Sequence, residues 1–302
     1  MSLSLNARAA ALPPAAVLAV AVTAGSGMDA TIKYLALSSP IITVIFARYA
    51  LASVFSWFIW KRAGAPRISA EMWRANGVRG IVIAAAASLF FWALTVLPLA
   101  EAVTYSFIYP LIMTFVARLM LGERIRITSI VSAGLGFVGV LVATQGAPSA
   151  QVSPLHWLGV AAVLTSASLF SLAMILMRAR ARADGVEIAN LMTSVVPGLI
   201  IAIPALVFGG MPHLTDWPVF LLMGALAATF MYLVARAYAN AEAQTLAPIH
   251  YTELVWASLI GFAVFNEAPR MQVFAGAALI IAACLYLAYD GARAARAAKE
   301  AA

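Results

Sequence analysis

Ten stretches of about 20 mostly apolar residues follow one another along this chain of 302 residues, separated only by short connections. A helix of that length spans the hydrocarbon core of a bilayer. Backbone groups in lipid must find partners within their own segment, which favours helices over the alternating segments of a barrel. The sequence therefore predicts an all-α membrane protein. The predicted spans are Pro13–Ala36, Pro40–Trp60, Val78–Leu97, Ala100–Leu119, Thr128–Gln145, Leu155–Met177, Ala189–Phe208, Trp217–Ala237, Thr245–Phe265 and Met271–Tyr289.

Composition agrees with this class. The chain is 64% hydrophobic and 10% charged, whereas soluble domains carry about 25% charged residues. Arg8, the apolar stretch 15–24 and the small residues 25–27 resemble a cleavable signal peptide. Apolar sequence resumes through Leu37, which favours an uncleaved first span.

The basic residues indicate an orientation. With the N-terminus in the cytoplasm, 16 of the 19 Lys and Arg residues fall on the inner side. Only Arg270 falls in an outer connection, and Lys33 and Arg48 lie within spans. Since cytoplasmic loops carry excess positive charge, we expect both termini in the cytoplasm and the chain in the inner (plasma) membrane. The net charge of +7 then reflects topology and predicts no nucleic-acid partner.

The two halves of the chain share a series of landmarks in the same order. Each has an Ala-Glu-Ala motif, an apolar span that ends at an acid, and a further span that contains Ala-Gly. These landmarks predict a repeat at residues 1–150 and a second at 151–302. With five spans each, the second repeat enters the membrane from the opposite side, an inverted arrangement typical of secondary transporters with a midplane site. The matched landmarks are Ala100–Thr104 with Ala241–Thr245, Ile108 with Ile249, Glu123 with Glu267, and Ala133–Gly134 with Ala275–Gly276.

These motifs, together with Pro110, Leu121-Gly122-Glu123 and Gly139-Val140, resemble the EamA type of the drug/metabolite transporter superfamily. The resemblance covers nearly the whole chain in spacing. It implies ten helices, alternating access, and a cavity lined mainly by the first, third, fourth, sixth, eighth and ninth helices. Within the family, the chain is most similar to bacterial exporters of aromatic and other amino acids.

Charged residues within spans are the strongest candidates for a site, because they are costly in lipid and face a cavity or a partner. Asp29 and Arg48 each lie roughly 12 Å from the outer end of their spans, so an ion pair between them is geometrically reasonable, and Lys33 lies one turn from Asp29. These residues either bind or gate a zwitterionic substrate or form a structural pair. Glu253 is either a proton or amino-group site or a buried structural acid, and His250 either titrates during transport or is structural.

Aromatic and small polar residues complete the predicted substrate site. Aromatic walls with a hydroxyl or indole N–H can stack on planar solutes, although Trp and Tyr also favour membrane interfaces. Tyr105 and Tyr109 are expected on one face of one helix. Serines near Ser168 either line a wet path or pack helices. The further candidates are Trp92, Tyr232 and Trp256.

Pro110 and Pro248 are predicted hinges, because proline inside a helix removes a hydrogen bond and frees a carbonyl; a static kink is the alternative. Gly134–Gly139 matches the dinucleotide motif G-x-G-x-x-G. That motif requires a preceding strand, so we interpret these glycines as helix-packing positions.

No metal site, cofactor or catalytic constellation is expected, so the chain is not predicted to be an enzyme. The leading hypothesis is a secondary transporter that exports aromatic and other small amino acids by alternating access. The alternative is export of a drug, nucleoside or sugar derivative on the same scaffold, and a channel or intramembrane enzyme is less favoured. The expected partners are the substrate and the lipid bilayer, and the sequence leaves the oligomeric state open.

Overall fold

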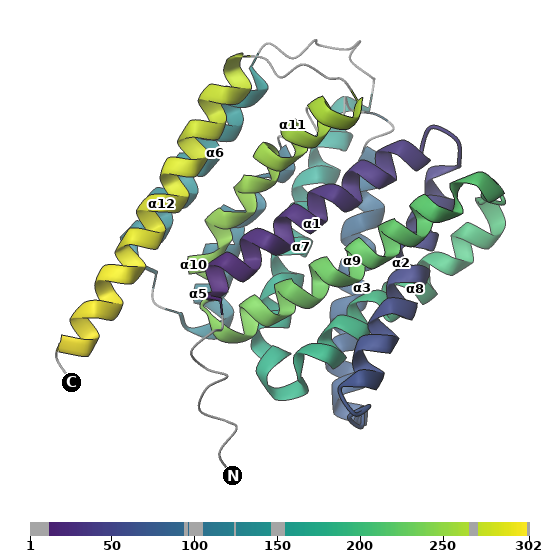
Figure 1. The fold of residues 1–302 in the computed structure, drawn as a ribbon, viewed down its shortest axis with the longest axis horizontal. Helices are drawn as coiled ribbons and strands as arrows, with labels where there is room; N and C mark the ends of the chain where they lie inside the picture. Colours follow the sequence, from purple (N-terminus) through teal and green to yellow (C-terminus); the bar gives the residue numbers. More distant parts are fainter. Residues whose placement is uncertain are drawn as a thin grey trace.

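A computed structural model describes residues 12–93, 96, 105–123, 125–145, 155–265 and 271–300 of the chain. Within these residues every regular element is a helix (Figure 1). The elements are α1 (Pro14–Leu35), α2 (Ile41–Arg62), α3 (Ala70–Ala93), α5 (Tyr109–Leu121), α6 (Ile127–Thr144), α7 (His156–Asp184), α8 (Val186–Phe208), η1 (Leu214–Asp216), α9 (Trp217–Asn240), α10 (Ala243–Leu246), η2 (Ala247–Tyr251), α11 (Thr252–Phe265) and α12 (Met271–Glu300).

Each of the ten predicted spans overlaps at least one of these helices. Three helices extend well past the predicted ends: α3 begins at Ala70, α7 continues to Asp184 and α12 continues to Glu300. The extensions of α7 and α12 are rich in Ala and Arg, which are strong helix formers even where hydropathy has fallen.

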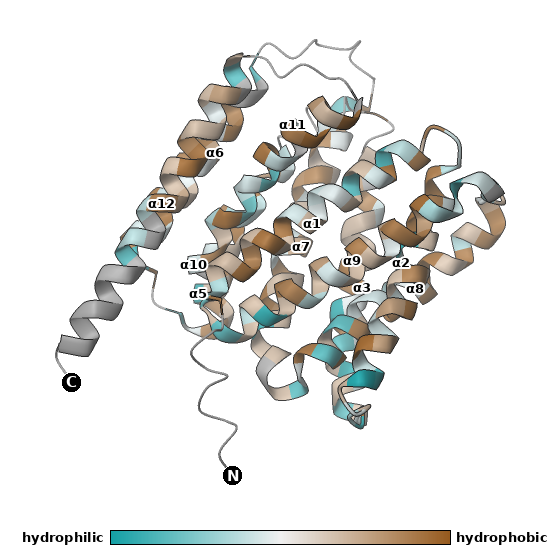
Figure 2. Cartoon of the chain, viewed as in Figure 1, coloured by the Kyte–Doolittle hydropathy of each residue, from teal (hydrophilic) through white to brown (hydrophobic). Residues whose placement is uncertain are grey.

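Five helices are long and apolar enough to cross a membrane: α1, α2, residues 156–181 of α7, α8 and α9. Shorter apolar helices cover α5 and parts of α6 and α12. Figure 2 shows hydrophobic residues along most of the helix lengths. Large apolar side chains such as Leu119 and Leu206 are more than four-fifths exposed. An outer surface of this kind is suited to lipid.

The packing interleaves the first and second halves of the chain. Along one edge, α6 runs beside α12 (Figure 1). Elsewhere α1 packs on α9 and α11, α2 on α8 and α9, α3 on α7 and α8, and α5 on α7. The helix α1, where the predicted charged site lies, therefore packs mainly on helices of the second half of the chain.

The glycine motif lies at helix contacts, as the packing interpretation requires. A Cβ on Gly136 would collide with the Tyr251 ring, and one on Gly139 would lie 2.8 Å from the carbonyl oxygen of Gly276. A Cβ on Gly134 would meet open space. Two of the three glycines thus allow α6 to approach η2 and α12 closely.

Two helices are broken at corresponding places. A turn at 107–108 precedes α5, and η2 separates α10 from α11. Pro110 lies in the first turn of α5, where backbone amides have no intrahelical acceptor, so the prediction that it removes a bond inside a continuous helix is wrong. Pro248 lies within η2, the 3₁₀ segment between α10 and α11. A hinge role for either proline stays a prediction.

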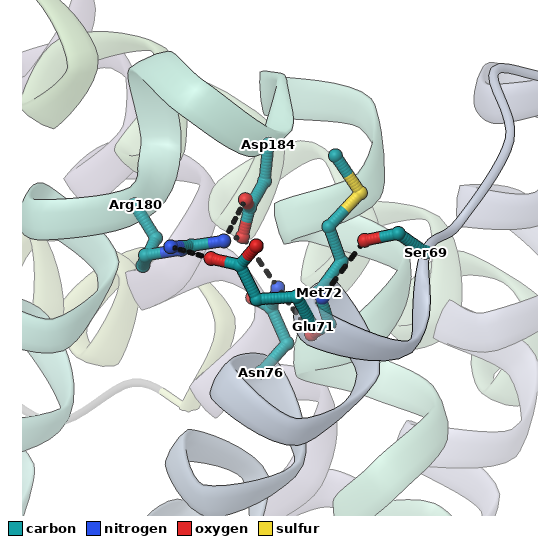
Figure 3. Close-up of polar contacts among 6 residues, drawn as sticks. All are labelled: Ser69, Glu71, Met72, Asn76, Arg180 and Asp184. Carbon is teal, nitrogen blue, oxygen red and sulfur yellow. Dashed lines mark hydrogen bonds and ion pairs between the residues drawn. The ribbon is translucent and has the colours of Figure 1, made fainter.

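A polar cluster joins α3 to the end of α7 (Figure 3). Asp184 is almost fully buried; it accepts hydrogen bonds from Asn76 (2.8 Å) and from Arg180 Nη2 (2.8 Å). Arg180 also pairs with the exposed Glu71 at 2.8 Å. A negative charge at a helix C-terminus is unfavourable, because that end of the helix dipole is itself negative. The contacts of Asp184 with Asn76 of α3 and with Arg180 must therefore offset this electrostatic cost.

We expect Asp184→Ala to lower stability more than Glu71→Ala, although both remove a partner of Arg180. Loss of Asp184 leaves the buried Asn76 amide without this acceptor, which costs about 1–3 kcal/mol, and it also breaks the pair with the partly exposed Arg180. Loss of Glu71 removes an exposed pair worth about 0–1 kcal/mol. Thermal unfolding of the two purified variants in detergent measures the difference, and equal shifts in midpoint would contradict it.

Candidate functional site

Asp29 and Glu253 lie on two packed helices, one from each half of the chain. Asp29 lies two-thirds of the way along α1, and Glu253 lies in the first turn of α11, just after η2. The two carboxyls are close enough to interact electrostatically. Ser26, one turn before Asp29, approaches the Glu253 carbonyl oxygen at 3.5 Å. The broken helix thus brings an acid of the second half of the chain against α1.

The two acids are more exposed than their neighbours on α1. Asp29 is exposed and Glu253 is partly exposed, whereas Gly25, Ser26 and Met28 beside Asp29 are buried. α1 packs on α2, α9, α10, α11 and η2. An exposed acid on a helix contacted by five other elements marks a place that a polar solute can reach.

The two basic candidates lie at the margin of this pair. Arg48 on α2 acts electrostatically on Asp29. Its Nε donates to Met28 Sδ at 3.1 Å, and its guanidinium lies 4.6 Å from the centroid of the Tyr49 ring. Lys33 lies in the last turn of α1 and is partly exposed. Arg48 therefore contributes the nearby positive charge, while its Nε–H donates to sulfur.

Tyr109 and His250 form an aromatic contact next to the acids. Their ring centroids are 5.4 Å apart in an edge-to-face arrangement. Both are buried, and Tyr109 also packs edge-to-face on Phe170. The hydroxyl of Tyr238 on α9 lies 3.1 Å from His250 Nε2. The charges of Glu253 and Asp29 both act on Tyr109, so the aromatic cluster and the acid pair are neighbours.

The prediction that Tyr105 and Tyr109 share one helix face is wrong. Tyr105 precedes the turn at 107–108 and packs with Ala93 and Val163, whereas Tyr109 lies in the main core. A helix break thus falls between two residues that a continuous α-helix would align. His250 lies in η2, where it contacts Tyr238, and Glu253 lies in α11.

The other candidates are placed as follows. Trp256 is partly buried against the main core, Tyr232 on α9 is partly exposed, and Trp92 near the end of α3 is exposed. Ser168 is exposed and donates to Leu164 of its own helix at 2.9 Å. Two serines of α7 reach other helices: the Ser166 hydroxyl donates to the Ala86 carbonyl oxygen of α3 at 2.7 Å, and the Ser171 hydroxyl donates to the Tyr109 carbonyl oxygen at 2.9 Å. The sequence marked both only as serines near Ser168.

A second charged group, which sequence reasoning missed as a site, joins the ends of α5, α7 and α9 to the start of α10. Arg178 Nε lies 3.4 Å from Glu123 Oε1, and Arg178 Nη1 donates to the Tyr238 carbonyl oxygen at 3.0 Å. The exposed pair Arg126–Glu242 lies alongside at 3.5 Å. A cavity of about 280 Å³ there is lined by Glu123, Arg178 and Glu242 among others. The sequence signal that could have revealed this group is the presence of acidic and basic residues at the ends of spans, close to the repeated landmarks.

Among the residues that the structure describes, no group of three or more His, Cys, Asp or Glu side chains is arranged to hold a metal ion. The side chains assembled at the centre are two carboxyls, a guanidinium nearby and aromatic rings. Such a set is suited to reversible binding of an amino group beside a ring: carboxylates accept from ammonium, and rings stack or attract cations.

The chain is similar to a known family of transporters and to several of its members. The model of the EamA-like transporter family matches the chain twice, at residues 14–145 and 157–289. A riboflavin transporter of Brucella anthropi is 26% identical over 251 residues, which cover 82% of this chain and 88% of that protein. An S-adenosylmethionine uptake transporter of Rickettsia bellii is 24% identical over 273 residues, covering 90% and 91%. A pseudopaline exporter of Pseudomonas aeruginosa is 25% identical over 264 residues, covering 87% and 91%.

One solved structure is similar in fold across nearly the whole chain. The TM-score is 0.79 at 17% sequence identity, and the match covers 91% of this chain and 98% of the other. At that identity the likeness concerns the fold alone. The helical arrangement described above is therefore one that an independently solved protein also adopts.

Proposed function

Because the chain belongs to the EamA-like transporter family of the drug/metabolite transporter superfamily, we propose that it is a secondary transporter that exports amino acids and similar small solutes by alternating access. Membrane transport follows from the family. The solute class, the direction and the mechanism are our proposals. The named relatives handle riboflavin, S-adenosylmethionine and pseudopaline, and they include both uptake and export, so the site itself must support the solute class.

The proximity of Asp29 on α1 to Glu253 on α11, where Ser26 approaches the Glu253 carbonyl oxygen at 3.5 Å, carries the proposal. Two acidic side chains within a membrane protein are expensive unless they face a cavity or bind a cation. The ammonium group of an amino acid can donate to both carboxyls, since it has three N–H donors. Arg48 nearby supplies positive charge for the substrate carboxylate, and Tyr109 and Trp256 supply aromatic surface for a ring.

The charged group of Glu123 and Arg178, near the ends of α5 and α7, supports alternating access. Glu123 and Arg178 hold the end of α5 to the end of α7, and Glu123 also accepts from the Ala243 amide at 3.4 Å. We propose that these contacts close the cytoplasmic side in this conformation and open when the site turns inward. Two family matches of nearly equal length favour two inverted five-helix repeats, with ten spans and both termini in the cytoplasm of the inner membrane.

A different solute on the same scaffold is the second candidate. The riboflavin transporter among the relatives favours a planar ring system, such as a nucleoside derivative, over an amino acid. Such a solute would use the aromatic surface of Tyr109 and Trp256 and would depend less on the two acids. The two candidates thus differ in whether a solute amino group is required.

Uptake into proteoliposomes separates the candidates. We expect counterflow of labelled phenylalanine in vesicles preloaded with unlabelled phenylalanine, at rates well above protein-free vesicles. Tyrosine and tryptophan should compete, and riboflavin should not. Counterflow of riboflavin or a nucleoside, with none of any amino acid, would refute the proposed solute class and favour the second candidate.

A further inference from the structure

We propose that the groove between α2 and α8 binds an acyl chain of an anionic phospholipid, with the phosphate of that lipid held by Lys61. The groove takes no part in the proposed solute site, and the inference does not depend on which solute is transported. It assigns a second ligand, supplied by the membrane itself, to the helix that carries Arg48.

The walls of the groove are suited to hydrocarbon. The groove lies where α2 packs on α8 (Figure 1) and has a volume of about 360 Å³. Val54 and Phe58 in its wall are about half exposed, so the groove opens at the surface. The Ser53 hydroxyl donates to the Tyr49 carbonyl oxygen at 2.7 Å, so its hydrogen is already in use. A polar group placed here would lose its hydration without gaining that hydrogen bond. The lining residues are Ser53, Val54, Trp57 and Phe58 of α2 with Leu191 and Val195 of α8.

A positive charge lies at one end of the groove. Lys61 follows Trp57 by one turn on the same face of α2, and its Nζ lies 5.1 Å from the centroid of the Trp57 ring. The ring attracts the ammonium group, which has three N–H donors and can therefore also donate to a phosphate oxygen. Arg62, exposed at the next position, adds a second positive charge. Basic side chains beside a pocket between membrane helices are typical of sites for anionic lipid head groups.

One acid lies near the same end of the groove. Glu187 is in the first turn of α8, one turn before Leu191. Its Oε2 would lie 3.6 Å from a Cβ on Gly185, so the carboxylate lies against the start of its own helix, where the helix dipole favours a negative charge. The dipole of α2 likewise favours Lys61 and Arg62 at its C-terminal end. It does not account for an apolar groove that ends at the Lys61 ammonium.

A phospholipid fits this groove better than a second copy of the chain does. A twofold dimer would bring the same patch of both copies together, and the two Lys61 ammonium groups would repel each other at a membrane interface of reduced dielectric. An anionic phospholipid supplies hydrocarbon for the groove and a negative charge for Lys61. Trp57 and Lys61 are also residue types that mark the level of the head groups.

The lipid preference of the purified full-length chain tests the site. The probes are phosphatidylglycerol and phosphatidylcholine with identical acyl chains, added to delipidated protein in detergent and counted by native mass spectrometry. We expect one tightly bound phosphatidylglycerol per chain. Phosphatidylcholine, whose choline group neutralises the phosphate, should bind about fivefold more weakly or less. Equal binding of the two lipids by the wild type overturns the proposal, and this arm needs no variant to fold.

The phosphate contact is tested with Lys61→Gln. We expect phosphatidylglycerol to bind this variant about fivefold more weakly, because one basic residue near a membrane surface contributes ~1 kcal/mol. Arg118→Gln is the matched control, since it removes an exposed positive charge from the last turn of α5, and it should bind as the wild type does. Equal loss in the two variants overturns the assignment of the phosphate to Lys61.

The acyl-chain contact is tested with Val54→Trp, which should fill the groove and remove the tightly bound phosphatidylglycerol. Val138→Trp makes the same change on α6 at a similarly exposed position, 47% against 50%, and should keep it. Wild-type binding by Val54→Trp overturns the proposed groove. A wild-type dimer that Val54→Trp dissociates overturns the proposal in favour of a second copy of the chain.

Discussion

Replacing Asp29 with asparagine will nearly abolish solute transport while leaving the fold intact. The substitution keeps the size of the side chain and removes the negative charge that faces Glu253 and Arg48. A hydrogen bond to a charged group is worth about 1.5–3 kcal/mol, which corresponds to roughly a 10- to 100-fold loss of affinity. Counterflow in proteoliposomes measures transport, and the elution profile and unfolding midpoint in detergent measure folding.

Asp290→Asn is the matched control for Asp29→Asn. It removes the same charge from a partly exposed position near the end of α12, away from α1, and should transport normally. A wild-type rate in Asp29→Asn would refute the assignment of this acid to the substrate site. A misfolded Asp29→Asn would instead identify the acid as structural, which is the alternative that the sequence left open.

Glu123→Ala will have the second large effect, by opening the end of the molecule where α5 meets α7. The substitution leaves Arg178, whose side chain is only 16% exposed, without its carboxylate. Breaking a buried pair from one side costs about 3–5 kcal/mol, enough to shift a two-state equilibrium almost completely. We expect transport to fall sharply because the site can no longer close on that side.

Cysteine labelling reports this opening directly. In a Cys284→Ala background, Ala117→Cys places a thiol at a fully buried position one turn before Leu121 on α5. Maleimide should label it slowly when Glu123 is present and rapidly in Glu123→Ala. Exchanging the charges, Glu123→Arg with Arg178→Glu, should restore part of the protection. Arg126→Ala breaks an exposed pair worth about 0–1 kcal/mol and should leave labelling slow; equal labelling in both variants would refute the closure.

Much of the helical framework could be predicted, because lipid imposes a length and a composition on each span. All ten predicted ranges contain helix, and the packing role of Gly136 and Gly139 followed from the motif and its apolar setting. The helix ends were less predictable, because hydropathy marks where lipid ends and not where backbone hydrogen bonding ends. For that reason the end of α12 and the start of α3 differ from the predicted ends of the corresponding spans.

The site was only partly predictable. Asp29 and Glu253 were each identified as costly within a membrane, yet the sequence suggested Arg48 or Lys33 as the partner of Asp29, since both are near in sequence. The proximity of Asp29 to Glu253 depends on how α11 packs on α1, and no local pattern encodes that. The start of α5 had a signal, because proline is favoured in the first turn of a helix, but the alignment of Tyr105 with Tyr109 assumed an uninterrupted helix.

The contact between Tyr109 and His250 has a mechanical consequence. Since Ile108 matches Ile249 in the proposed repeats, Tyr109 and His250 are equivalent positions that touch each other. Equivalent points of two bodies related by a twofold axis can touch only beside that axis. Displacement in a rocking motion grows with distance from the axis, so under the proposed mechanism we expect this contact to act as a fulcrum and to keep nearly the same length in both orientations, whereas we expect the Glu123–Arg178 pair to separate. Distance probes at 109 and 250 would serve as the fixed reference against which the movement of every other helix is measured.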